Sequence, residues 1–175
     1  MDQPYTNERD DQSEEEKLLQ LVGFTIGKEQ FGVDILMVQE IIRKAPITSI
    51  PDSPGFIEGV INLRGNIIPV IDLRKRLNLF HSKNQNDGSW IIILNIEKRV
   101  TGFIVDSVTE VLKIRKDTIK PPPDIVVAGL KSQYISGVCK LDKGLLILLN
   151  FNRILLVEEI KKLKEIERSK RAVNA

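Results

Sequence analysis

The residue types that most often carry catalytic or metal chemistry are scarce in this chain of 175 residues. Its one histidine, His81, follows a predicted short helix and has no cysteine or carboxylate at ligand spacing, which is typical of a surface residue. Its one cysteine, Cys139, lies inside the apolar run GVCKL, as a buried and inert thiol would. The sequence therefore predicts neither a zinc site nor a cysteine nucleophile, and a single cysteine excludes an intrachain disulfide.

Phosphate-binding and acid–base motifs are not found either. Gly27 and Gly32 have the spacing that opens a P-loop, but Val33 and Asp34 follow where that motif needs a lysine and a hydroxyl. No GxGxxG or GxSxG occurs. The carboxylates that lie among apolar neighbours form no pattern typical of a catalytic pair: Asp34, Glu40, Glu58, Asp72, Asp106 and Glu110. We therefore expect no catalytic activity, no metal and no cofactor.

Two charged residues stand out because each interrupts a strand-like apolar segment. Arg64 follows the run GVINL and precedes Gly65, so it lies at a predicted tight turn where it could pair with a carboxylate or reach a partner. Glu40 lies in VQEII, where strand alternation puts it on the same face as Val38. Composition leaves two alternatives open: both charges belong to a contact site, or both are solvated and contribute little to stability.

The run after Arg64, NIIPVIDL, contains Pro69, which has no backbone N–H to donate to a sheet. We expect its strand at a sheet edge, at a bulge, or with that position facing away from its neighbour. An open edge beside Arg64 would be a place for a partner to dock.

Short apolar runs predict eight to ten strands with little helix, a pattern typical of an all-β sandwich or barrel. The runs cover 18–26, 31–35, 38–43, 56–63, 67–71, 89–97, 100–106, 108–114, 134–141 and 144–150. Asp72 is a predicted N-cap for a short helix in DLRKRLNL. From Asn152 onward a C-terminal helix is predicted, with one apolar stripe formed by Leu156, Ile160, Leu163 and Ile166.

A weak internal repeat underlies these strands. Gly32 aligns with Gly102, which sets Val38 over Val108 and Glu40 over Glu110, and Gly59 aligns with Gly137. The match of PVIDLRKRL to LLNFNRILL needs a one-residue shift. Two similar halves, each too small for a robust core, predict paired β-barrels with an apolar groove between them for a ligand or partner helix.

Charge and hydropathy set the predicted boundaries. Residues 1–17 hold seven acids and two bases, which predicts a disordered acidic tail, and the folded domain is expected over 18–156. Residues 157–175 form a predicted basic helical extension. The sequence begins without an apolar signal segment and contains no run long enough to span a bilayer, so we expect a cytoplasmic protein. The net charge of +2 and the 5% aromatic content argue against nucleic acid as a partner.

Two segments, FGVDILMVQEI (31–41) and FIEGVINLRGNIIPVIDL (56–73), closely resemble the CheW family of bacterial chemotaxis coupling proteins. WIIILNIEKRVTGFIVDSVTEVL, IKPPPD and YISGVCKLDKGLLILLN fit the same family, so the resemblance covers about 18–156. It implies two SH3-like five-stranded barrels around a shared core, with a short helix between them and a C-terminal helix. It also implies a non-catalytic adaptor that links the cytoplasmic tips of methyl-accepting chemotaxis receptors to the regulatory domain of the histidine kinase CheA.

The resemblance assigns receptor contacts to Val38, Glu40, Gly59 and Arg64. It assigns kinase contacts to Lys120 and to Ile125, which replaces what is often an aromatic residue in the family. It further implies recruitment to receptor arrays at the inner face of the membrane, without insertion. The alternative left open is a small β-barrel that binds single-stranded nucleic acid or oligosaccharide.

Overall fold

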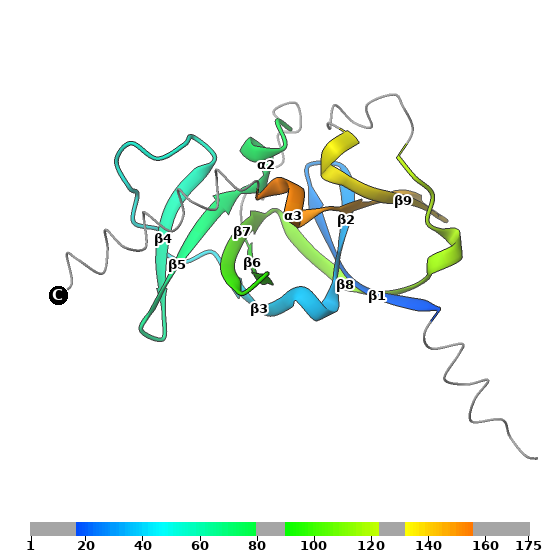
Figure 1. The fold of residues 1–175 in the computed structure, drawn as a ribbon, viewed down its shortest axis with the longest axis horizontal. Helices are drawn as coiled ribbons and strands as arrows, with labels where there is room; N and C mark the ends of the chain where they lie inside the picture. Colours follow the sequence, from blue (N-terminus) through cyan, green and yellow to red (C-terminus); the bar gives the residue numbers. More distant parts are fainter. Residues whose placement is uncertain (1–16, 80–89, 123–131, 156–175) are drawn as a thin grey trace, which may run out of the picture.

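The computed structural model describes residues 17–79, 90–122 and 132–155 (Figure 1). The ten predicted strands are all present, in two consecutive groups of five along the chain. The first group is β1 (Leu18–Ile26), β2 (Glu29–Asp34), β3 (Val38–Arg43), β4 (Ile57–Leu63) and β5 (Asn66–Asp72). The second group is β6 (Trp90–Ile96), β7 (Arg99–Val105), β8 (Ser107–Arg115), β9 (Ile135–Leu141) and β10 (Gly144–Leu149). The short helices are η1 (Ile35–Met37), α2 (Leu73–Arg76), η2 (Lys116–Thr118), η4 (Ser132–Tyr134) and α3 (Phe151–Ile154).

Several predicted features fall outside the described residues. These are the acidic tail before Lys17, the C-terminal helix beyond Leu155, His81 and Ile125. The short helix after Asp72 is confirmed: the Asp72 carboxylate accepts hydrogen bonds from the backbone N–H groups of Arg74 and Lys75. The domain boundaries at 18, 156 and 157 stay predictions.

The two halves of the chain exchange strands. One five-stranded sheet has the order β8-β1-β2-β10-β9 and the other has the order β3-β6-β7-β5-β4. We call these the first barrel and the second barrel. Each takes two strands from one half of the chain and three from the other, because β3 leaves the first barrel for the second and β8 makes the reverse crossing.

Each sheet curls until its two edges meet through a backbone bridge. In the second barrel, Thr48, which follows β3, pairs with Val60 of β4 through two hydrogen bonds of 2.9 Å. In the first barrel, Lys120, which follows β8, pairs with Val138 of β9 through two bonds of the same length. The two bridges occupy equivalent places, so both sheets close in the same way.

The glycine pairs of the sequence repeat occupy equivalent positions. Gly32 and Gly102 lie in the parallel strand pairs β2–β10 and β7–β5. Gly59 and Gly137 lie beside the two closing bridges. The predicted one-residue shift further along is wrong: Asp72 and Asn150, 78 residues apart like the two bridge glycines, are the N-caps of α2 and α3.

A shared hydrophobic core fills the interface between the barrels. Its buried members come from both sheets and include Phe24 and Phe31 of the first barrel, whose rings stack at 5.6 Å. Phe103 of the second barrel packs edge-on against Phe151 of α3 at 5.0 Å. Where this core lies, the interface between the barrels is filled with side chains and forms no open groove.

Of the three places predicted for Pro69, the sheet edge is wrong, because Pro69 lies in the inner strand β5. Val60 of β4 pairs opposite it, but the parallel ladder with β7 begins only at Val70. Pro69 thus precedes the point at which β5 acquires its second partner, so the missing N–H interrupts no β5–β7 ladder. The edge strand next to Arg64 is β4.

Candidate functional site

The β4–β5 turn places Arg64 in a fixed position. Leu63 and Asn66 pair across the hairpin, which leaves Arg64 and Gly65 as a two-residue loop. Both have positive φ, 51° and 85°, as in a type I′ turn, and the Asn62 side chain accepts a hydrogen bond from the Gly65 N–H at 2.9 Å. A left-handed backbone is unfavourable for a residue other than glycine by about 1 kcal/mol.

Arg64 and Glu40 form a bidentate ion pair. One guanidinium nitrogen donates to Glu40 Oε2 at 2.9 Å and the other to Oε1 at 2.5 Å. The Arg64 side chain is 69% exposed and that of Glu40 is 27% exposed. An exposed pair of this kind contributes at most about 1 kcal/mol to stability. The pair joins β3 to the turn that ends β4, which are the two opposite edges of the second sheet.

β3 presents a row of side chains that leads to this ion pair. Alternating burial along β3 confirms the predicted shared face of Val38 and Glu40, and a bulge lies between these two residues. Val38 is half-buried against the shared core. Two residues before it, Leu36 of η1 is 89% exposed. Leu36 was not among the predicted contact residues. A signal for it exists in the sequence, because four successive apolar residues over 35–38 cannot all face inward on a short segment.

A cleft of about 430 Å³ adjoins Leu36. Its walls come from the start of β1, from η1 and from the end of β8, and they combine apolar residues with lysines: Leu18, Leu19, Gln20, Asp34, Ile35, Leu36, Lys113 and Lys116. This cleft, at the crossing from the first barrel to the second, has the mixed apolar and polar lining that a partner helix needs.

Gly59 has an internal role. It is buried, its φ is 147°, and a Cβ placed on it would lie 2.0 Å from the carbonyl oxygen of Thr48. The close backbone approach that a glycine allows at this position is made by the chain's own Thr48. The structure thus brings Glu40 and Arg64 into contact on the surface, while Gly59 supports the closing bridge beneath it.

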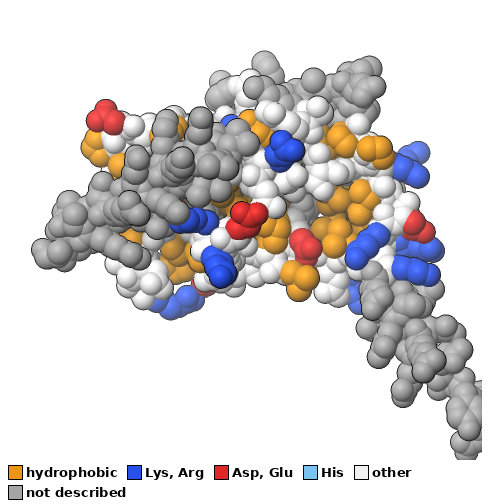
Figure 2. All heavy atoms as spheres, in the orientation of Figure 1, with side chains coloured by type: hydrophobic (Ala, Val, Ile, Leu, Met, Phe, Trp, Pro, Cys, Tyr) orange, Lys and Arg blue, Asp and Glu red, His pale blue; other side chains and the backbone are white. Residues whose placement is uncertain are grey.

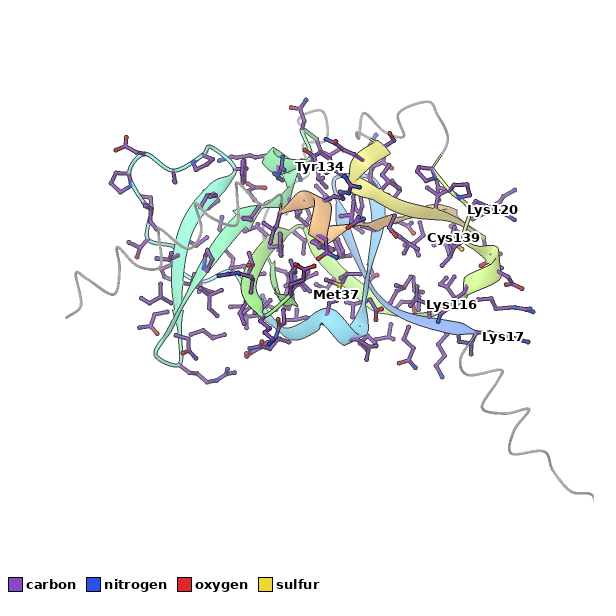
Figure 3. All side chains as sticks on the ribbon, in the orientation of Figure 1. Lys17, Met37, Lys116, Lys120, Tyr134 and Cys139 are labelled. Atoms are coloured by element: carbon purple, nitrogen blue, oxygen red, sulfur yellow. The ribbon has the colours of Figure 1, made fainter. Side chains whose placement is uncertain are left out.

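The predicted kinase contact Lys120 lies on the other barrel. Its side chain is exposed, and its backbone forms the bridge to Val138. Figure 3 shows Lys120 near Lys116, at the end of the first barrel opposite the β4–β5 hairpin. Lys120, the predicted kinase contact that the structure describes, therefore belongs to a different barrel from the predicted receptor contacts.

A second charged cluster, which the sequence did not reveal, lies between the barrels. Asp106, only 4% exposed, accepts hydrogen bonds from Arg74 at 2.5 Å and from the Gly27 N–H at 2.6 Å. Lys75 pairs with Glu58 nearby, which raises the pKa of the Lys75 amine. Because Asp106 begins the crossing from β7 to β8, its pair with Arg74 fixes that crossing.

This charged cluster lines a cleft of about 290 Å³, together with Asp72. Burial raises the pKa of the Asp72 carboxyl. All three carboxylates of the cleft, Glu58, Asp72 and Asp106, are already engaged by lysine, arginine or backbone N–H groups. Engaged acids of this kind are typical of a structural network rather than of an acid–base pair.

Other kinds of site find no support in the described residues. No group of three potential metal ligands comes together there. Cys139 is buried, as predicted. The described aromatic side chains are buried or, at Phe56 and Trp90, half-buried, so none of them is an exposed stacking surface of the kind the nucleic-acid alternative uses. No described helix is both long and apolar enough to cross a membrane.

Comparison with known proteins identifies the family. The CheW-like domain model matches residues 20–159. The chemotaxis protein CheW of Klebsiella aerogenes is 38% identical over 83% of this chain and 87% of its own length. CheW of Treponema pallidum is 33% identical over 84% of this chain and 88% of its own length. The crystal structure of the scaffolding protein TtCheW from Thermoanaerobacter tengcongensis is 38% identical, with a TM-score of 0.73 over 81% of this chain and 90% of that chain. The match confirms the predicted pair of SH3-like barrels, and the chain belongs to the CheW family of chemotaxis adaptor proteins.

Proposed function

We propose that this adaptor binds the cytoplasmic tips of methyl-accepting chemotaxis receptors and the regulatory domain of the histidine kinase CheA at the same time. Family membership supports the two partner classes. The separation of the candidate residues supports simultaneous binding, since Glu40 and Arg64 lie on the second barrel and Lys120 lies on the first. The adaptor would then work at receptor arrays on the inner face of the membrane, as a scaffold without catalytic activity.

The proposed receptor surface runs along η1 and β3. Leu36 and Val38 supply apolar contact, and the Glu40–Arg64 pair supplies charged groups at the far end. Leu36 and Glu40 are four residues apart, at most about 13 Å along an extended chain. A receptor helix of about nine residues has the same length, so one helix face can contact the whole row.

The observation that carries this proposal is the exposed Arg64–Glu40 pair. A pair this exposed contributes little to stability, and Arg64 occupies a backbone conformation that glycine or asparagine adopts more readily. Neither fact explains an arginine at this position by folding alone. A guanidinium held in place by its carboxylate partner is well suited to protein contact.

Gly59 and Ile125 are the two other residues predicted as partner contacts. Gly59 is buried beneath the Thr48 bridge, so we propose that it acts on receptor binding only through the position of β4. Ile125 lies outside the described residues and remains a predicted kinase contact, as does Lys120.

A pull-down assay with a receptor tip fragment, and separately with the CheA regulatory domain, tests the proposal. Arg64→Asn keeps a residue that tolerates positive φ and removes the cation, so it should weaken receptor capture and leave kinase capture intact. Glu40→Gln should act in the same direction. Lys28→Gln, at the exposed β1–β2 turn of the first barrel, is the control, because Lys28 lies outside both proposed contact surfaces. Unchanged receptor capture by both site variants would refute the receptor assignment.

A further inference from the structure

The cleft beside Leu36 has a net positive lining, with two lysines and one carboxylate. Lys113 of β8 and Lys116 of η2 line it, and neither side chain makes an ion pair with any described residue. The one carboxylate in the lining, Asp34, accepts a hydrogen bond from the Leu36 N–H at 2.9 Å. Figure 2 shows lysine and arginine side chains gathered at this end of the first barrel. The cleft therefore favours an acidic occupant.

The first described residues of the chain, Lys17 and Leu18, lie at this cleft. The Lys17 carbonyl accepts a hydrogen bond from the Lys116 N–H at 2.9 Å, and Leu18, the next residue, lines the cleft. Figure 3 shows Lys17 and Lys116 side by side at the start of β1. Any segment preceding Lys17 is thus tethered directly at the mouth of the cleft.

The tethered segment has the complementary charge. Residues 1–16 contain seven acids and one base, and six of those acids are concentrated in the nine residues 8–16. The match to the family model begins at residue 20, so the acidic segment lies outside the matched domain.

We propose that the acidic segment 1–16 occupies the cleft formed by Leu36, Lys113 and Lys116, as an intramolecular competitor of the partner helix. The competition rests on the receptor surface proposed above, whereas the docking itself does not. The contact is electrostatic and requires no fixed secondary structure in the segment. Receptor binding then requires the partner helix to displace the segment.

Tethering makes weak ionic contacts sufficient for this role. A short flexible link gives the segment an effective concentration in the millimolar range at the cleft. A cleft covered nine-tenths of the time would weaken the apparent affinity of a competing helix about tenfold. Exposed charges are screened by salt, with a Debye length of about 8 Å at physiological ionic strength, so coverage should fall as salt rises.

Amide chemical shifts of the full-length protein test the docking without any partner. The reference variant replaces five acids by their amides: Asp10→Asn, Asp11→Asn, Glu14→Gln, Glu15→Gln and Glu16→Gln. At about 0.01 M salt, we expect its shifts to differ from those of the unmodified chain at Leu36, Lys113 and Lys116. At about 1 M salt the differences should vanish. They should be independent of protein concentration, since a contact with a second copy would grow with it.

Matched variants locate the docking site. Lys113→Gln with Lys116→Gln should abolish the effect of the five amide substitutions. Lys98→Gln with Lys143→Gln, which neutralises exposed hairpin lysines elsewhere, should preserve it. Three outcomes would overturn the proposal: no shift differences at the cleft, differences confined to the basic segment 157–175, or differences that scale with concentration.

A receptor-fragment titration separates this inference from the proposed function. If both hold, the five-amide variant binds the fragment about tenfold more tightly at low salt. If the shifts support docking but the fragment binds neither protein, the proposed receptor function fails and the docking stands. If the fragment binds both proteins equally and no cleft shifts occur, only the docking fails.

Discussion

The two barrels close in the same way but differ in charge at equivalent positions. The equivalents of Glu40 and Arg64, offset by 70 and 78 residues, are Glu110 and Asp142 in the first barrel. There the ion pair is replaced by two carboxylates that form no ion pair with any described residue. The first barrel nonetheless closes through the Lys120–Val138 bridge. An ion pair across the sheet edges is therefore no requirement of this fold, and its presence in the second barrel needs another explanation.

The β4–β5 turn also differs in backbone conformation from its equivalent in the first barrel, the β9–β10 turn. Both loops contain two residues, but Arg64 and Gly65 have positive φ, whereas in the β9–β10 turn of the first barrel positive φ occurs only at Gly144, after the loop residues Asp142 and Lys143. The second barrel thus uses an unfavourable backbone conformation where the first does not. The β6–β7 turn of the second barrel has the same feature, with positive φ at Glu97 and Lys98. The backbone of the β4–β5 turn therefore brings Arg64 within reach of Glu40, but this conformation is not peculiar to that pair.

The largest expected effect on stability comes from the hydrophobic core that the two barrels share. Phe103→Ala in the second barrel and Phe31→Ala in the first should each lower the free energy of unfolding by about 3–5 kcal/mol, because both rings are fully buried in one core. Each variant should also unfold in a single transition. Urea denaturation followed by Trp90 fluorescence, which reports the second barrel, and by amide exchange in β9 and β10 checks this. Separate transitions for the two barrels would show that the shared core does not couple them.

The bridge glycines provide a sharper comparison. Gly59→Ala should destabilise the protein by about 3 kcal/mol, because the new Cβ meets the rigid Thr48 carbonyl at 2.0 Å and φ is positive. At Gly137 the nearest atom is the Cγ2 of Ile119 at 2.5 Å, a side chain that can shift, so Gly137→Ala should cost about 1–2 kcal/mol.

Chemical denaturation of the two glycine variants measures both costs. Equal destabilisation would mean that the two bridges are equally adaptable. A stable Gly59→Ala protein that fails to capture receptor would instead make Gly59 a direct contact and contradict its internal role.

The charge difference predicts a smaller effect on stability. Arg64→Asn should change the free energy of unfolding by less than about 1 kcal/mol, since the lost surface pair is offset by a residue better suited to φ of 51°. Asp142→Asn, at the equivalent position of the first barrel, should change it by no more than about 0.5 kcal/mol. Denaturant titrations of both variants check this. A loss above about 2 kcal/mol for Arg64→Asn would make the ion pair part of the fold and weaken its assignment as a contact site.

Much of the fold follows from local sequence signals. Alternation of apolar residues predicts the ten strands, and the glycine pairs 32/102 and 59/137 predict two equivalent units. The exchange of β3 and β8 could not be predicted, because the pattern of a strand is the same whichever barrel it joins. The Arg74–Asp106 pair was hidden because its members are 32 residues apart and meet only through the parallel pairing of β5 with β7.

The candidate site could likewise be predicted only in part. Residue types and the turn signal predict Arg64 and Glu40 as the notable charges, but their contact depends on how the sheet curls and brings its edges together. Gly59 was predicted as a receptor contact, yet only the Thr48 bridge reveals that the backbone lying against it is the chain's own.

The smallest expected effect compares the helix caps after the two barrels' inner strands. Burial raises the pKa of Asp72 above its usual 3.8, whereas the equivalent N-cap Asn150 does not titrate. The folded protein then holds the Asp72 proton more tightly than the unfolded chain does. The contribution of Asp72 to stability is greatest below about pH 3.8 and is lost as pH rises through the folded-state pKa.

Asp72→Asn removes this titration while keeping a good N-cap, so the stability of the wild type relative to the variant should decline as pH rises from about 3 to 7, by less than about 1 kcal/mol in total. Urea unfolding of both proteins across that range measures the difference. Asn150→Asp is the reciprocal variant, and it shows whether a carboxylate behaves alike at both caps. A difference that instead grows with pH would mean that the backbone N–H groups of Arg74 and Lys75 outweigh burial and hold the Asp72 pKa below its usual value.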